Sequence, residues 1–343
     1  MMRRLCCAVL AVAASGAIGL AQTPSAPYRI LKTAKVGGDG GFDYVYADVP
    51  GRRVYIPRSS TPPHVTVFDL DSLAPLGDIA TPSARGAAVD PKSGHGFASS
   101  KPVVMWDTRT LKPIKNIDVQ GNPDGIMFDP FNDRVWVFSH AMPHATVLNA
   151  ADGTVVGTLD LGGQPEQAVT DSKGRIYVDL EDTNQIAVVD AKALKVVTHY
   201  GLGGKGGAPA GLAFDVKNRI LFAAGSEPPS MVILNADDGK IVTSLPIGVG
   251  VDGAVFNPAT MEAFSSQRDG TLTVVKENSP TSFVVEQTVK TMPSAKTLTL
   301  DSKTNHILLI GAEFGPPAAA AAGRGRGRGA VLPDSFSILV VGR

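Results

Sequence analysis

The fold of this chain is decided by the stretch DSKGRIYVDLEDTNQIAVVD, residues 171–190. Asp171 begins a turn, and the β-branched run Arg175–Val178 follows that turn. A second run, Ile186–Asp190, again ends in an acid. Short runs of Val, Ile and Tyr bounded by turn residues are typical of β-strands. The stretch therefore predicts two short strands.

The same pattern recurs seven times. Each unit begins with an apolar run that ends in Asp or Asn, and these anchors are Asp48, Asp90, Asp129, Asp171, Asp215, Asn257 and Asp301. Successive anchors lie 42, 39, 42, 44, 42 and 44 residues apart. Units of this length with four short strands, and no sustained helical periodicity, indicate propeller blades. We predict an all-β fold, a seven-bladed β-propeller of four-stranded antiparallel blades.

The two ends of the chain are predicted to meet in the last blade. The seventh unit begins at Ala295, supplies His306–Ile310 and Ser337–Val341, and then ends one strand short. The segment Tyr28–Val36 matches the last-strand pattern of the other units. Pairing this segment into the seventh blade covers strand edges that would otherwise be exposed. We therefore expect the N-terminal strand to close the ring.

Residues 1–21 have the features of a secretory signal peptide. Arg3 and Arg4 supply a positive end, and the segment Leu5–Leu20 is apolar and uncharged. Cleavage after Ala21 satisfies the rule of small residues at the cleavage site. The apolar core is short for a membrane span. We expect a periplasmic or secreted protein with no membrane span after signal removal.

Both cysteines, Cys6 and Cys7, lie inside this leader. Residues 22–343, which we predict to form a single domain, therefore contain no thiol. This excludes a disulfide framework, a thiolate metal site, a thiol nucleophile and an attached c-type haem in that domain. The chain has 32 basic and 32 acidic residues among its 343. That balance argues against a uniformly basic surface for nucleic acid.

Residues 315–333 form a low-complexity insertion in the seventh unit. The insertion contains a Pro pair, five consecutive alanines and Gly-Arg repeats with Arg324, Arg326 and Arg328. Two interpretations stay open, a neutral spacer or a basic arm that adheres to nucleic acid or another polyanion.

The units share a pattern of Arg-x-Tyr-Val, a strand ending in Asp, and a Pro-containing return loop. Arg175–Val178 with Val189-Asp190 follows it, as do the return loops Asn122–Gly125 and Gln164–Glu166. In this the chain resembles the YVTN repeats of bacterial seven-bladed propellers, including the YncE-like periplasmic proteins, over residues 28–343. The resemblance implies a WD40-like propeller. It leaves function open, because that family includes nucleic-acid binders and surface-layer proteins.

The residue five positions before each anchor is predicted to open the innermost strand, near the axis on one face. These residues are Asp43, Arg85, Asp124, Glu166, Ala210, Asp252 and Lys296. Four acids and two bases would then ring the channel mouth as a site for a cation or polar molecule. The alternative is turn chemistry, because Asp-Gly pairs favour turns. We expect no metal, because a sevenfold ring would separate the carboxylates too far for one ion. No motif predicts a cofactor.

Three histidines, His64, His140 and His144, are predicted in loops between second and third strands, on the same face as the mouth. His140 and His144 are four apart, but their segment is a Pro-containing loop without a glutamate, so it lacks the helical metal motif. We treat these two as weak catalytic candidates. Ordinary exposed loop histidines are the alternative.

Three functions stay open at this point. The first is a non-enzymatic exported binding or scaffold propeller, monomeric, acting on a protein, an envelope polymer or a small ligand. The second is a lyase or lactone hydrolase in which His140 or His144 works with Glu166 as acid and base. The third is a periplasmic nucleic-acid-binding propeller, as the family resemblance implies. The absence of a nucleophile, thiolate or metal motif favours the first.

Overall fold

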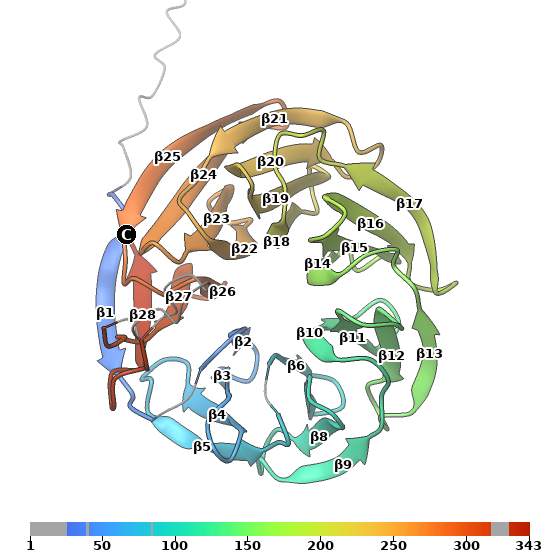
Figure 1. The fold of residues 1–343 in the computed structure, drawn as a ribbon, viewed down its shortest axis with the longest axis vertical. Coiled ribbons are helices and arrows are strands. Elements are labelled where there is room, and N and C mark those ends of the chain that lie inside the picture. The colour runs from blue at the N-terminus through green and yellow to red at the C-terminus, as the bar shows by residue number, and fades with distance from the viewer. Residues whose placement is uncertain (1–25, 39–40, 84, 317–328) are drawn as a thin grey trace, which may run out of the picture.

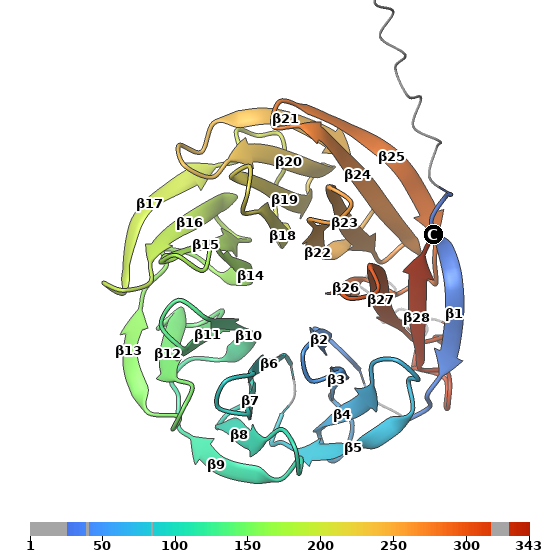
Figure 2. The same cartoon turned by 180° about the vertical axis from the view of Figure 1, so that it is seen from behind.

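Seven sheets stand around a central axis in the computed structural model (Figures 1 and 2). The structure describes residues 26–38, 41–83, 85–316 and 329–343, so the predicted leader lies outside them. The described residues form 28 strands and no helix, arranged in seven four-stranded antiparallel sheets. This confirms the predicted seven-bladed β-propeller. Within these ranges no helix has the length and hydropathy needed to cross a membrane.

Each blade runs from an innermost strand at the axis to an outermost strand at the rim. The first blade contains β2 (Tyr46–Asp48), β3 (Arg53–Arg58), β4 (His64–Asp69) and β5 (Pro75–Ala80). The second contains β6 (Ala87–Asp90), β7 (His95–Ala98), β8 (Val103–Asp107) and β9 (Pro113–Ile117). The third contains β10 (Pro123–Asp129), β11 (Arg134–Ser139), β12 (Ala145–Asn149) and β13 (Val155–Leu159).

The remaining blades repeat this order. The fourth contains β14 (Pro165–Thr170), β15 (Arg175–Leu180), β16 (Gln185–Asp190) and β17 (Lys195–Gly201). The fifth contains β18 (Pro209–Asp215), β19 (Ile220–Ser226), β20 (Pro229–Asn235) and β21 (Ile241–Pro246). The sixth contains β22 (Val251–Asn257), β23 (Glu262–Gln267), β24 (Thr271–Ser279) and β25 (Ser282–Lys290). The seventh contains β26 (Thr297–Asp301), β27 (His306–Gly311), β28 (Ser337–Gly342) and β1 (Arg29–Lys35).

The N-terminal strand closes the ring as the sequence predicts. Strand β1 pairs antiparallel with β28, so that Arg29 lies opposite Gly342 and Lys35 opposite Ser337. Just before β1, the hydroxyl of Tyr28 donates a hydrogen bond of 2.6 Å to Glu262 in the sixth blade. The two ends of the chain therefore join the seventh blade and also fasten it to the sixth.

The repeated anchors stabilise the turns that follow the innermost strands. The Asp171 carboxylate accepts hydrogen bonds from the backbone N–H groups of Lys173, at 2.8 Å, and Arg175, at 2.9 Å. Asp48 accepts in the same way from Gly51 at 3.0 Å. Asp and Asn bond their own backbone two or three residues on, which explains why these types recur. The anchors are therefore structural residues.

The hydrophobic core lies between blades. Among the described residues, each core cluster draws side chains from two neighbouring blades. Trp136 and Val147 of the third blade, for example, pack with Ile176 and Val178 of the fourth. A single blade cannot bury its apolar faces alone, so the ring forms as one unit.

The base of the insertion closes on itself. Phe314 and Val331 form an isolated antiparallel bridge, and the N–H of Gly315 donates a hydrogen bond of 2.8 Å to the carbonyl of Ala330. Residues 317–328, with the three arginines of the predicted arm, lie outside the described residues.

Candidate functional site

The innermost strands all begin at the same end of the axis and place one residue from each blade there. Asp124, Glu166 and Asp252 are the second residues of β10, β14 and β22, whereas Asp43, Arg85 and Lys296 come just before β2, β6 and β26. The seventh position is held by Ala210 in β18. We call this end of the axis the mouth.

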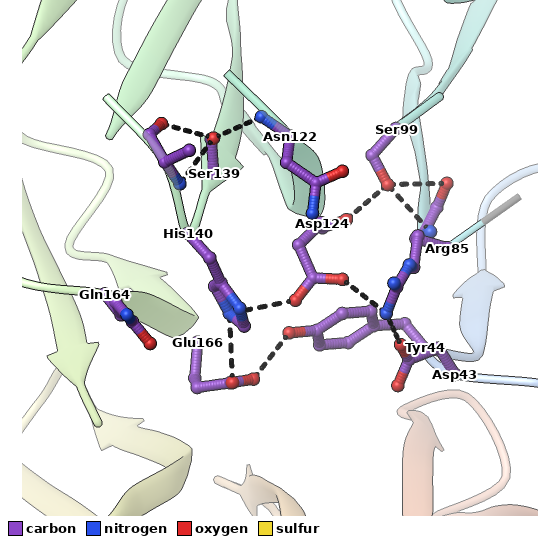
Figure 3. A network of polar contacts seen from close by, with 12 residues as sticks. Asp43, Tyr44, Arg85, Ser99, Asn122, Asp124, Ser139, His140, Gln164 and Glu166 are labelled. Atoms are coloured by element: carbon purple, nitrogen blue, oxygen red, sulfur yellow. Dashed lines mark hydrogen bonds and ion pairs between the residues drawn. The ribbon is translucent and has the colours of Figure 1, made fainter. Parts of the chain in front are cut away.

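Opposite charges from neighbouring blades pair around the mouth. Nη1 of Arg85 lies 3.0 Å from Oδ2 of Asp43 and 3.3 Å from Oδ1 of Asp124 (Figure 3). Nζ of Lys296 lies 3.3 Å from Oδ1 of Asp43 and is also paired with Asp252. The structure thus brings five of the six predicted charged residues into one chain of ion pairs.

His140 brings in the sixth residue, Glu166. It lies in the loop between β11 and β12, and its Nε2 is 3.1 Å from Oδ2 of Asp124 and 3.1 Å from Oε1 of Glu166 (Figure 3). Contact with these two carboxylates raises the pKa of His140 to about 10. Both carboxylates therefore favour the protonated form of the imidazole.

Tyr44 crosses the mouth from the first blade to the fourth. Its hydroxyl donates a hydrogen bond of 3.1 Å to Oε2 of Glu166 (Figure 3). Burial, reinforced by the charges of Glu166, Asp124 and Asp43, holds the pKa of this hydroxyl well above its ordinary value. Tyr44 is not predictable from the repeat, because aromatic residues do not recur at this position of it. Its only signal is its place directly after Asp43.

Two further acids lie beside Glu166. Asp179 in β15 is fully buried, and neither of its oxygens has a hydrogen bond among the described residues. Burial, and then the charge of Glu166, hold the Asp179 pKa well above its ordinary range. The pKa of Glu181 is also raised, by burial and then by Glu166. Asp179 is not distinguished in the sequence, because it lies within the pattern of an ordinary buried strand.

In two other blades the position equivalent to Asp179 holds a serine that makes a hydrogen bond to the next blade. Ser99 and Ser266 occupy the equivalent place in β7–β8 and β23, and each hydroxyl bonds the carbonyl of the mouth residue in the next blade, Asp124 and Lys296 respectively. The fourth blade carries a carboxyl group in place of that hydroxyl. A buried acid without a hydrogen-bond partner thus replaces a satisfied serine.

A cavity of about 260 Å³ lies inside the ring, and Tyr44, Glu166 and Asp252 are among its lining residues. Its other walls are mainly apolar, with Ile126 and Phe128 among them. Burial raises the pKa of Asp252 to about 7, an effect that Lys296 opposes and other mouth acids reinforce. A larger cavity of about 780 Å³ lies at the base of the insertion, with Arg268, Ser294 and Glu313 among its lining residues.

The other two histidines lie apart from this network. His64 is the first residue of β4 rather than a loop residue, which corrects its predicted place. It contacts Ser60 at 3.0 Å and Asp78 at 3.7 Å. His144 does lie in the predicted loop, where its Nδ1 is 2.6 Å from Asp160. The described contacts of both rings are with residues other than those of the mouth.

Comparison with known proteins identifies the fold. The sequence matches no family model and no curated protein. The solved structure of RRP9 WD40 repeats is similar with a TM-score of 0.72 at 10% identity, covering 92% of this chain and 97% of the other. That of U3-55K has a TM-score of 0.70 at 11% identity, covering 91% and 98%. A hydrazine synthase chain of Kuenenia stuttgartiensis has a TM-score of 0.68 at 13% identity, covering 79% and 92%. The chain is thus a β-propeller with WD40-type structural neighbours.

Proposed function

We propose that this protein is an exported binding propeller that holds a small ligand bearing a positive charge at the mouth. Its WD40-type fold is consistent with a binding or scaffold role. Export is supported by the features of residues 1–21, and membership of the YVTN and YncE-like propellers by the repeat pattern. A monomeric state is a further part of the proposal.

The proposal rests on the excess of acid at the mouth. Six carboxyl groups gather there: Asp43, Asp124, Glu166, Asp179, Glu181 and Asp252. Arg85, His140 and Lys296 pair with four of them, and the charge of Arg268 also acts on Lys296. Burial and repulsion from neighbouring acids raise the pKa values of Asp179, Glu181 and Asp252, which disfavours the charged forms of these carboxyl groups. A cationic group placed among them would relieve that repulsion.

The alternative of an acid–base enzyme has less support. A general base must be unprotonated at the working pH, and the pKa of His140 is raised to about 10. His144 contacts Asp160 rather than Glu166. Nucleic-acid binding through the arginine arm concerns residues 317–328, outside the described part of the chain.

The test is a thermal-shift screen of paired compounds, each amine-bearing sugar or short lysine peptide beside its neutral counterpart. At 100 times its Kd, a ligand specific to the folded state raises the free energy of unfolding by about 2.7 kcal/mol. We expect cationic members to stabilise the protein, and Asp43→Asn or Asp252→Asn to lower their affinity about tenfold.

Asp78→Asn is the matched control, because it removes a carboxylate that pairs with His64 outside the mouth. It should leave affinity unchanged. Equal stabilisation by the neutral counterparts, or full affinity in both mouth variants, would contradict the proposal.

A further inference from the structure

One group of side chains within the mouth has the geometry of a metal centre. Asp124, His140 and Glu166 each offer one ligand atom, and these atoms all lie within 4.8 Å of one another. We propose that these three side chains bind one divalent transition-metal ion, such as Zn²⁺ or Mn²⁺. This inference rests on the proposed function in taking the mouth as the binding site.

The separations of the ligand atoms fit one ion. Nε2 of His140 is 3.1 Å from a carboxylate oxygen of Asp124 and 3.1 Å from one of Glu166. Ligand atoms about 2.0–2.2 Å from a shared ion lie about 2.8–3.6 Å from each other at octahedral or tetrahedral angles. Two of the three separations therefore already have the required length.

Neither carboxylate oxygen lies where Nε2 of His140 could donate a well-aligned hydrogen bond. A hydrogen bond requires the acceptor close to the N–H axis, yet Nε2 of His140 has no hydrogen bond of acceptable geometry among the described residues. An ion on the Nε2 axis has the opposite requirement, because each oxygen must then lie off that axis, beside the ion. The arrangement of the two oxygens meets this second condition.

A second observation is the buried carboxyl group of Asp179. It has no hydrogen-bond partner among the described residues, and its strand, β15, pairs with β14, the strand that carries Glu166. A buried acid without a partner carries a large desolvation cost. A cation held at Glu166 would place a positive charge next to the strand that carries this unpartnered group.

The expectation of no metal assumed evenly spaced carboxylates around a sevenfold ring. That premise does not hold for the third and fourth blades, because His140 reaches from its loop between Asp124 and Glu166. One imidazole and two carboxylates suit first-row divalent ions. Calcium is a poorer fit, because it takes six to eight oxygen ligands.

The experiment uses the full chain, freed of metal with a chelator and titrated separately with Zn²⁺, Mn²⁺ and Ca²⁺ by calorimetry. We expect one Zn²⁺ or Mn²⁺ per chain and much weaker Ca²⁺. Asp124→Asn, His140→Gln and Glu166→Gln should each lower the affinity about 100-fold or more, because even residues that only support a metal ligand affect affinity by 10–100-fold.

His144→Gln is the matched control, because it removes a histidine–carboxylate pair outside the mouth. It should bind the ion as the unaltered chain does. No saturable binding to the unaltered chain, full affinity in all three mouth variants, or loss of binding in His144→Gln would each overturn the inference. Melting temperatures measured in chelator identify any variant that fails to fold, and the remaining variants then decide.

The two proposals fail separately. If the chain binds no ion but Asp43→Asn and Asp252→Asn weaken a cationic ligand, the metal centre is wrong and the proposed function stands. If the ion binds as expected but no cationic ligand does, the metal centre stands and the proposed function is wrong.

Discussion

At the scale of single residues, the buried acids differ in how many of their carboxylate oxygens accept a hydrogen bond. The anchors such as Asp171 are satisfied by backbone N–H groups of their own turns. Glu277 in β24 is only partly satisfied: one oxygen accepts a hydrogen bond of 2.7 Å from Asn218, and the other has no partner among the described residues. Burial, and the nearby Asp215, raise the pKa of Glu277 to about 7.

This shift predicts a stability that depends on pH. Between about pH 4.5 and 7 the folded chain holds the Glu277 proton more tightly than the unfolded chain does, so this group's contribution to stability falls as pH rises. Above that window both states are ionised and the penalty is constant. Glu277→Gln should therefore raise the free energy of unfolding by about 1–3 kcal/mol at pH 8.

Urea unfolding at pH 8 and at pH 5 measures this effect. At pH 5 the folded chain already holds the proton on Glu277, so the variant should gain much less there. Comparing variant with unaltered chain at each pH cancels the contributions of Asp252 and other groups. An equal gain at both pH values would show that ionisation of Glu277 is not the cause.

At the scale of elements, β1 and the residue before it hold the seventh blade together and join it to the sixth. It supplies the outermost strand of the seventh blade by pairing with β28. Tyr28, just before it, also contacts the sixth blade: its hydroxyl donates to Glu262, and Arg343 lies 4.4 Å above its ring. Ring closure thus depends on a segment far from its partners in the sequence.

Deleting residues 28–36 should therefore destabilise the whole ring and not only the seventh blade. We expect a large fall in the melting temperature followed by circular dichroism, because the deletion exposes an edge of β28 and removes the link to Glu262. Tyr28→Phe, which retains the strand and loses only the hydroxyl hydrogen bond, should have a much smaller effect, about 1 kcal/mol. An unchanged melting temperature in the deletion would show that the ring closes without β1.

At the scale of the whole molecule, the cores between blades predict one cooperative transition. Trp106 packs in the core between the first and second blades, and Trp136 in the core between the third and fourth. Neither core can open without exposing apolar surface on two blades. Tryptophan fluorescence and far-ultraviolet circular dichroism should accordingly report the same midpoint in urea. Two separated midpoints would show that groups of blades unfold independently.

The sequence could predict most of the architecture because repeats are local. The spacing of the anchors and the pattern of each strand predicted seven blades, closure by the N-terminal strand, and one residue per blade at the axis. The seven blades and the closure are confirmed. The six charged residues predicted at the axis do converge there. The placement of His140 in its loop was also predictable. The prediction that His64 lies in a loop was wrong by one residue, because β4 begins at His64 itself. A polar first residue of a strand resembles the last residue of a loop in the sequence.

The sequence by itself determined the ring and which positions of each repeat face its axis, because period and strand pattern are properties of neighbouring residues. Only the tertiary structure decided which of those side chains meet. Tyr44 reaches Glu166 across 122 positions of sequence, and His140 joins the acids of two blades. The distances between blades decide these contacts. Burial and these contacts together decide the pKa values of the side chains, so neither the contacts nor the pKa values follow from the repeat alone.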